Sequence, residues 1–146
     1  MIYLDTSAII KLYFKEVFSQ DISKWLSNNN EALPLTSFHY LEFINAVKQK
    51  QFREEISSDE ADHIISRFDA HEMKGVYYRP PIEWATVFKY AHDLSKKHTE
   101  NIGSRSLDIM HVASALSLHT DIFLTFDDRQ SQLASCAGLE IIQFIK

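Results

Sequence analysis

The stretch Ile2-Tyr3-Leu4-Asp5-Thr6-Ser7 ends a short apolar run with a carboxylate and two hydroxyls. Its apolar residues predict a short buried strand, and Thr6 and Ser7 predict the cap of a helix that follows directly. A strand that leads at once into a helix is typical of folds in which parallel strands pair through helical crossovers. Asp5 is therefore expected at the carboxyl end of a strand, the edge of the sheet where such folds place their functional crevice.

Three further segments also place an acid among apolar residues. They are HYLEFIN (39–45), SLDIMHVASAL (106–116) and FLTFDD (123–128), and their acids are Glu42, Asp108 and Asp127. Burying a carboxylate costs several kcal/mol unless it is paired or bound to a metal. The four acids together therefore indicate that a cation gathers them, which predicts a metal-dependent enzyme.

The rest of the chain alternates short apolar strands with helices. Strands are predicted over 2–4, 32–35, 76–78, 122–125 and 139–144. Helices are predicted from Thr6 onward, over 20–26, from a cap at Ser37 to 52, after a Ser57–Glu60 capping box, and over 83–97, 107–118 and 129–137, with a loop over 98–105. This order predicts one α/β domain over residues 1–146, with a mainly parallel sheet between helices on both faces. Asp5 and Asp127 would follow strands and Glu42 and Asp108 would lie in first helical turns, so all four would share one rim.

Composition limits the possible functions less than the acids do. A net charge of −5 argues against binding nucleic acid through the overall field, so phosphate contacts would need a local basic patch. Candidates for that patch are Lys11, Lys15, Lys48, Lys50, Arg53, Lys96, Lys97 and Arg105. Cys136 is the only cysteine, and neither a membrane-length apolar run nor a secretory leader is visible. We therefore expect a cytoplasmic protein with no membrane contact.

Oxygen-only ligands favour Mg²⁺ or Mn²⁺ over zinc. Such a cation can lower the pKa of a bound water and neutralise charge on a phosphodiester. His111 and Asn45 each follow an acid by three residues, so each could orient that acid or only pack in its helix. Asp128 is expected to be a helix N-cap rather than a ligand.

Four motifs in this order resemble the PIN domain, and in particular the VapC-type toxin ribonucleases. They are D-T-S at 5–7, E-x-x-N-A at 42–46, D-x-x-H-x-A-x-A at 108–115 and T-x-D at 125–127. The tail FDDRQSQLASCAGLEII at 126–142 is similar to the end of many such toxins. The resemblance therefore covers nearly the whole chain.

The resemblance implies a five-stranded parallel sheet and a catalytic site in which Asp5, Glu42, Asp108 and Asp127 hold one or two Mg²⁺ or Mn²⁺ ions. It further implies that the hydroxyl of Thr6 or Ser7 assists and that Thr125 lies near the metals. The implied reaction is endonucleolytic RNA cleavage by a metal-activated water, in the toxin of a type II toxin–antitoxin system. The implied partners are an RNA substrate, a cognate antitoxin and a second copy of the chain in a homodimer. For the antitoxin groove, we look to Ile10, Phe14 and Trp25.

Other readings remain open. The chain could be a PIN-type nuclease outside a toxin–antitoxin pair, or a scaffold that binds metal and RNA without cutting. A phosphatase with Asp5 as nucleophile, like haloacid-dehalogenase-like proteins, would carry a second acid two residues later. Ser7 occupies that position, which makes this reading weak.

Overall fold

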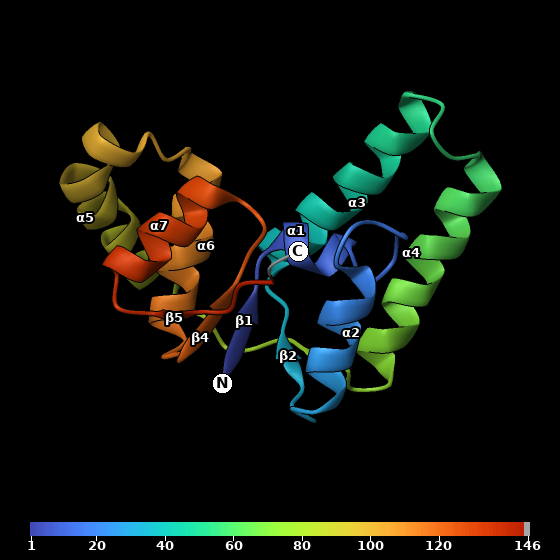
Figure 1. Ribbon diagram of the computed structural model, residues 1–146, viewed down its shortest axis with the longest axis horizontal. Helices are drawn as coiled ribbons and strands as arrows, with labels where there is room; N and C mark the ends of the chain where they lie inside the picture. Colours follow the sequence, from blue (N-terminus) through green and yellow to red (C-terminus); the bar gives the residue numbers. More distant parts are fainter. Residues whose placement is uncertain (145–146) are drawn as a thin grey trace. The chain divides into compact units, whose positions relative to one another are not determined.

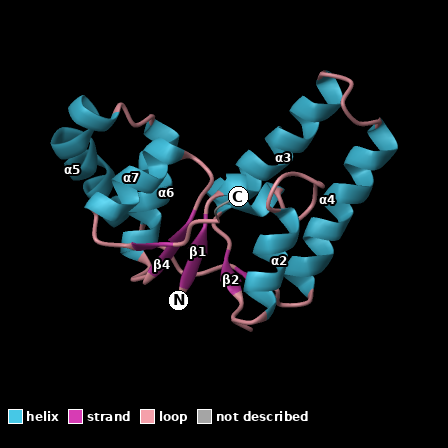
Figure 2. Cartoon of the chain, viewed as in Figure 1, coloured by secondary structure: helices cyan, strands magenta, loops and turns pink. Residues whose placement is uncertain are grey.

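The structure is a computed structural model that describes residues 1–144 (Figures 1 and 2). Its elements in chain order are β1 (Ile2–Leu4), α1 (Thr6–Ile10), α2 (Ser19–Ser27), β2 (Leu33–Pro34), α3 (Ser37–Phe52), α4 (Ser58–Met73), β3 (Tyr77–Tyr78), α5 (Trp84–Ile102), α6 (Ser106–Ser117), β4 (Ile122–Leu124), α7 (Asp128–Cys136) and β5 (Glu140–Ile141). This order confirms the predicted α/β fold of parallel strands flanked by helices. Within residues 1–144, no helix combines the length and apolar character that crossing a bilayer requires.

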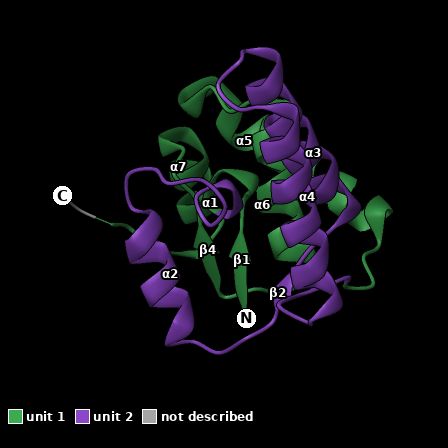
Figure 3. Cartoon of the chain, turned by 90° about the vertical axis from the view of Figure 1, so that its right-hand side faces the viewer, with its two compact units in different colours: residues 1–8, 80–146 green, residues 9–79 purple. Residues whose placement is uncertain are grey.

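The chain divides into two compact units (Figure 3). Residues 1–8 and 80–146 form unit 1, and residues 9–79 form unit 2. The described strands make parallel pairs in both: β1-β4-β5 in unit 1 and β2-β3 in unit 2. The strands are thus parallel as expected, but they form a three-stranded and a two-stranded sheet where a single sheet was predicted. Strand β2 is short, and Pro34 at its end has no N–H for a longer ladder.

Unit 1 is built around the β1–β4 pair. Tyr3 lies opposite Phe123 in the register, and the two rings stack with their centroids 5.4 Å apart. Helices α5, α6 and α7 add buried apolar side chains to this core, among them Val87, Val112 and Leu133. The pairing also aligns the strand ends where the chain turns polar.

Unit 2 has an aromatic core. Phe43 of α3 and Phe68 of α4 stack with centroids 3.9 Å apart, and Tyr13 meets both rings edge-on. The Tyr13 hydroxyl lies 2.6 Å from Nδ1 of His71 and donates to the Tyr77 hydroxyl, 3.1 Å away. Burial raises the pKa of Tyr77 to about 12, so this cluster holds neutral phenols.

Several helix boundaries differ from the predictions. Helix α5 continues to Ile102 instead of stopping at Lys97, and Gly103, with φ of 71°, ends it. The residues predicted as a loop are therefore mostly helical. Thr36, not Ser37, caps α3, and β5 is shorter than predicted. The Ser57–Glu60 capping box is confirmed.

Candidate metal-binding and nuclease site

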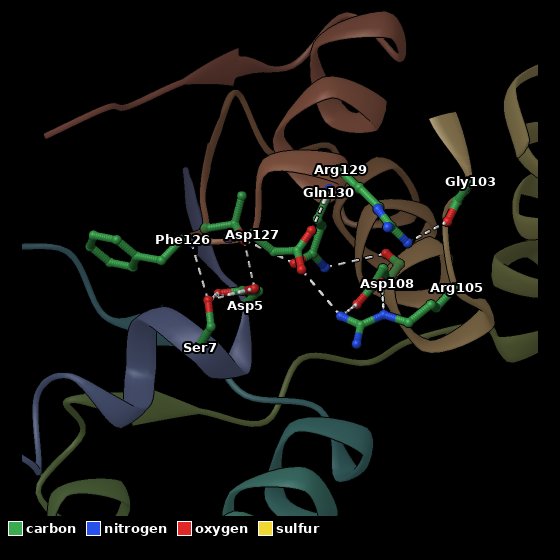
Figure 4. Close-up of polar contacts among 10 residues, drawn as sticks. Asp5, Ser7, Gly103, Arg105, Asp108, Phe126, Asp127, Arg129 and Gln130 are labelled. Atoms are coloured by element: carbon green, nitrogen blue, oxygen red, sulfur yellow. Dashed lines mark hydrogen bonds and ion pairs between the residues drawn. The ribbon is translucent and has the colours of Figure 1, made fainter. Parts of the chain in front are cut away.

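Asp5 lies directly after β1, and its backbone N–H donates to the carbonyl of Leu124 at 3.0 Å. Its side chain is buried, with the residue 3% exposed. The carboxylate accepts hydrogen bonds from Ser7 Oγ at 2.7 and 2.9 Å, from the Ala8 N–H at 2.8 Å and from Thr125 Oγ1 at 2.7 Å. Figure 4 shows Asp5 and Ser7 facing each other across the start of α1.

The surroundings of Asp5 leave its negative charge under-compensated. Burial raises the pKa of the carboxyl above its ordinary value of 3.8, although His111 and the hydrogen bonds from Ser7, Thr125 and Ala8 oppose that shift. A carboxylate destabilised by desolvation gains more from a bound cation than an exposed one does. Asp5 therefore has the electrostatics expected of a metal ligand.

The hydroxyls of Ser7 and Thr125 connect the ends of β1 and β4. Ser7 Oγ accepts a hydrogen bond from the Phe126 N–H at 3.1 Å (Figure 4). Thr125 Oγ1 accepts one from the Asp127 N–H at 3.0 Å and lies 2.9 Å from Oε1 of Gln130. These contacts orient Asp5 and fix the turn that presents Asp127. Of the two predicted hydroxyls, that of Ser7 donates to both carboxylate oxygens of Asp5.

Asp127 divides its carboxylate between two tasks. Oδ1 accepts from the Gln130 N–H at 2.9 Å, which caps α7. Oδ2 pairs with Nη2 of Arg105 at 3.1 Å. The prediction that Asp128 is the N-cap is wrong: Asp127 takes that role and Asp128 is the first helical residue. Oδ1 accepts only a neutral N–H, so the cap still leaves Asp127 able to pair with a cation.

Asp108 lies in the first turn of α6, as predicted, and is 9% exposed. Arg105 contacts both of its carboxylate oxygens, with Nε at 2.8 Å from Oδ2 and Nη2 at 3.3 Å from Oδ1. Gln130 Nε2 donates to the Asp108 backbone carbonyl at 3.3 Å. Figure 4 shows the Arg105 guanidinium between the carboxylates of Asp108 and Asp127.

His111 lies in a buried chain of hydrogen bonds. Its Nδ1 is 3.0 Å from the Tyr3 hydroxyl and its Nε2 is 3.3 Å from Thr6 Oγ1. These two contacts engage both nitrogens of the imidazole ring. Because Thr6 is the first residue of α1, its contact with His111 holds the start of that helix in place. We therefore interpret both residues as positioning groups.

Glu42 and Asn45 belong to unit 2, on α3. Glu42 is half-buried and Asn45 is exposed. Helix α3 begins at Ser37 and has no acid in its first turn, so the prediction that Glu42 lies there is wrong. Unit 1 thus brings Asp5, Asp108 and Asp127 to adjacent strand and helix ends. The role of Glu42 stays a prediction.

Most of the basic side chains predicted to contact phosphate pair instead with nearby acids. In unit 2 the N–O distances are 3.1 Å for Lys11–Glu16, 3.4 Å for Lys48–Asp62, 3.3 Å for Lys50–Glu55 and 2.8 Å for Arg53–Glu55. In unit 1 a hollow of about 440 Å³ is lined by Arg105, Phe126, Asp127, Asp128 and Arg129. Two arginines therefore border the hollow that contains Asp127.

The donor set suits a hard cation. Asp5, Asp108 and Asp127 offer carboxylate oxygens, which Mg²⁺ and Mn²⁺ prefer. The guanidinium between Asp108 and Asp127 shows that a positive group is stabilised at that place. In the described part of the chain, however, no three Asp, Glu, His or Cys side chains already form a cluster that could hold a metal. The chemistry therefore fits Mg²⁺, while Arg105 provides the positive charge in this arrangement.

Two side chains that contribute to this site, Gln130 and Arg129, were not predicted from the sequence. Gln130 follows the capping acid by three residues, a spacing that could have indicated its backbone contact but not its contact with the Asp108 carbonyl. Arg129 Nη1 donates to the Gly103 carbonyl at 3.3 Å (Figure 4). Arg105 was expected to contact phosphate, and its position three residues before Asp108 was a usable sign of the ion pair.

Several solved structures share this fold. FitAcB from Neisseria gonorrhoeae superposes with a TM-score of 0.73 at 15% identity, covering 98% of this chain and 97% of that one. VapBC-1 from nontypeable Haemophilus influenzae gives 0.66 at 19% identity, covering 97% of each chain. VapC20 of Mycobacterium tuberculosis, described as a toxin that cleaves the sarcin–ricin loop, gives 0.67 at 14% identity and covers 95% and 96%. At these identities the similarity shows the fold.

The family model of the PIN domain matches residues 2–135. The chain therefore belongs to the PIN-domain family, a fold of nucleases that typically binds Mg²⁺. Its structural neighbours include toxins of the VapC and FitB type. No curated protein matches the sequence significantly.

Proposed function

We propose that this protein is a Mg²⁺- or Mn²⁺-dependent endoribonuclease and the toxin of a type II toxin–antitoxin pair. The observation that carries the proposal is the Arg105 bridge between Asp108 and Asp127, together with Thr125, which donates to Asp5 and accepts from the Asp127 N–H. Asp5 is buried, and Asp108 and Asp127 share one guanidinium. Membership of the PIN-domain family supports the same chemistry.

Each residue has a defined part in this proposal. Asp5, Glu42, Asp108 and Asp127, the four acids of the sequence motifs, would hold the cation. A bound Mg²⁺ would supply a water of lowered pKa and neutralise charge on the scissile phosphodiester. Ser7 and Thr125 hold the Asp5 carboxylate in one orientation through their hydrogen bonds. Orientation fixed in advance lowers the cost of assembling the site.

The two arginines would meet the RNA backbone. Arg105 is two-thirds exposed, and both Arg105 and Arg129 line the hollow beside Asp127. Guanidinium groups bind phosphate oxygens in bidentate geometry. This local charge would attract a polyanion that the net charge of −5 would otherwise repel.

An antitoxin and a second copy of the chain are the proposed partners. FitAcB and VapBC-1 were crystallised as toxin–antitoxin complexes. Of the residues predicted for an antitoxin groove, Ile10 is buried, while Phe14 and Trp25 are partly exposed. A hollow of about 450 Å³ in unit 2 lies beside α2, with a mostly apolar wall lined in part by Leu12, Leu26, Ala32, Leu33 and Val76. We favour this hollow over Ile10 as part of the groove.

The test is cleavage mapping on total RNA. Wild-type protein should cut RNA with Mg²⁺ or Mn²⁺ and stop when EDTA is added. Asp5→Asn keeps the size of the side chain but removes its charge, and should lower the cleavage rate by about a hundredfold or more. Glu55→Gln, an exposed ion-pair variant in unit 2, is the matched control. Tight RNA binding without cleavage under either metal would favour a scaffold instead.

A further inference from the structure

We propose that Arg105 is an internal competitor of the divalent cation: its guanidinium bridges Asp108 and Asp127, and it leaves them when the cation binds. This inference rests on the proposed metal site. In this proposal a residue of the chain itself, Arg105, sets the affinity of the site for the cation.

The geometry of the bridge carries the proposal. Arg105 contacts both oxygens of Asp108 and the Oδ2 atom of Asp127. The other Asp127 oxygen caps α7 by accepting from the Gln130 N–H. Each oxygen through which these two acids could bind a metal therefore already accepts a hydrogen bond. A divalent cation at the same oxygens would meet a fixed positive charge at close range.

The bridge is also built to open. Arg105 is the residue before α6, with φ of −85° and ψ of 154°, so its backbone is already outside the helix. Its side chain is 67% exposed, whereas that of Asp108 is 13% exposed. The arginine can therefore rotate into solvent while the helix and its acid stay in place.

The bridge has a clear use in the metal-free state. Asp108 and Asp127 would repel each other if no positive group lay between them. Arg105 removes that repulsion and keeps both carboxylates oriented. The resulting cost is a weaker apparent affinity for the cation, because binding must first break the bridge.

The experiment measures metal binding directly. Free Mn²⁺ is quantified by electron paramagnetic resonance as it is titrated into the metal-free full chain, for wild type, Arg105→Ala and Arg129→Ala. Arg129→Ala is the control, because it removes the same charge from the same hollow. The Arg129 guanidinium donates to the carbonyl of Gly103. Arg105→Ala should bind Mn²⁺ about tenfold more tightly than wild type. The affinity of Arg129→Ala should rise by less than about threefold.

A second measurement uses the unaltered protein. The Nε–H resonance of Arg105 should shift as Mg²⁺ is added and saturate with the binding isotherm, since the bond to Asp108 is lost. Arg105→Gln, which keeps a long polar side chain, replaces the alanine variant if the latter does not fold. The proposal is overturned if the Arg105 variants bind Mn²⁺ no more tightly than wild type, or if Arg129→Ala gains as much affinity as they do. It is also overturned if no variant binds Mn²⁺ or if the Arg105 resonance does not move. Tight Mn²⁺ binding without RNA cleavage would instead contradict only the proposed nuclease function.

Discussion

Each unit contains a histidine bonded to a tyrosine, but the two clusters differ in what lies beyond them. In unit 1, His111 connects Tyr3 to Thr6, which directly follows the buried Asp5. In unit 2, Tyr13 connects His71 to Tyr77 among stacked phenyl rings, and none of these contacts involves a carboxylate. Similar polar groups thus position a charged site in one unit and fill an aromatic core in the other. The difference predicts that loss of a hydroxyl from the unit 1 cluster lowers both stability and activity, whereas the same change in the unit 2 cluster lowers stability alone.

The largest effect is expected from Phe43→Ala. Phe43 is fully buried and stacks on Phe68, so its removal leaves a cavity at the centre of unit 2. Such a truncation costs about 3–5 kcal/mol of the free energy of unfolding. Urea denaturation of wild type and variant measures it. Phe52→Ala, at an 88% exposed position, should cost little, and a similar loss in both variants would contradict the assigned core.

Thr125→Val should have the next largest effect. Valine has nearly the same shape but removes the hydroxyl that serves Asp5, the Asp127 N–H and Gln130. Leaving buried polar groups unsatisfied costs about 1–3 kcal/mol, and the misoriented Asp5 should also slow RNA cleavage. Thr125→Ser restores the hydroxyl and should recover both. Wild-type cleavage by the valine variant would mean that Thr125 does not orient the acid.

A pair of smaller changes tests the difference between the tyrosine–histidine pairs of the two units. Tyr3→Phe and Tyr13→Phe each remove one hydroxyl from a buried tyrosine that bonds to a histidine. Each should cost about 1 kcal/mol in the free energy of unfolding. Only Tyr3→Phe should lower the rate of RNA cleavage, because only its histidine leads to the acidic site. An equal loss of cleavage in both variants would remove the distinction between the units.

The smallest effect is a pH dependence from His71. Burial, and then the nearby Arg67 and Lys74, lowers the pKa of His71 below its ordinary 6.5. Between that lowered value and 6.5 the unfolded chain binds more protons than the folded one, so stability rises with pH there and levels off above 6.5. His71→Gln should flatten this part of the curve, measured by urea denaturation across the window. A variant curve with the same slope would assign the dependence elsewhere.

Asp5 should act in the opposite direction in the metal-free protein. Its raised pKa means that the folded state binds more protons above pH 3.8, so its contribution to stability is present below that value and is lost as pH rises. Asp5 and His71 therefore carry opposite pH slopes, one from each unit. This opposition follows from the sign of the charge that burial disfavours.

Local signals in the sequence were enough for most of the fold. The Ser57–Glu60 box, the β1 strand and the parallel α/β order were all predicted correctly. The predicted end of helix α5 at Lys97 is too early, because the polar residues after Lys97 suggest a loop. The helix in fact ends at its C-cap, Gly103. Tertiary contacts decide such boundaries more strongly than polarity does.

The candidate site was predictable in its acids but not in its contacts. Burial of Asp5 and Asp108 follows from their apolar neighbours, and both were expected at strand or helix ends. The bridge from Arg105 to Asp127 joins residues that are 22 positions apart, so no local spacing could indicate it. The choice of Asp127 over Asp128 as the cap likewise depends on where β4 ends.

The most direct test of the metal site is anomalous diffraction from crystals of the wild-type protein soaked in Mn²⁺. We expect an anomalous peak at coordination distance from carboxylate oxygens of Asp5 and Asp108, with Asp127 in direct or water-mediated contact and Arg105 withdrawn from the acids. A manganese ion found only at other residues, or no ion at these acids at millimolar Mn²⁺, would contradict it.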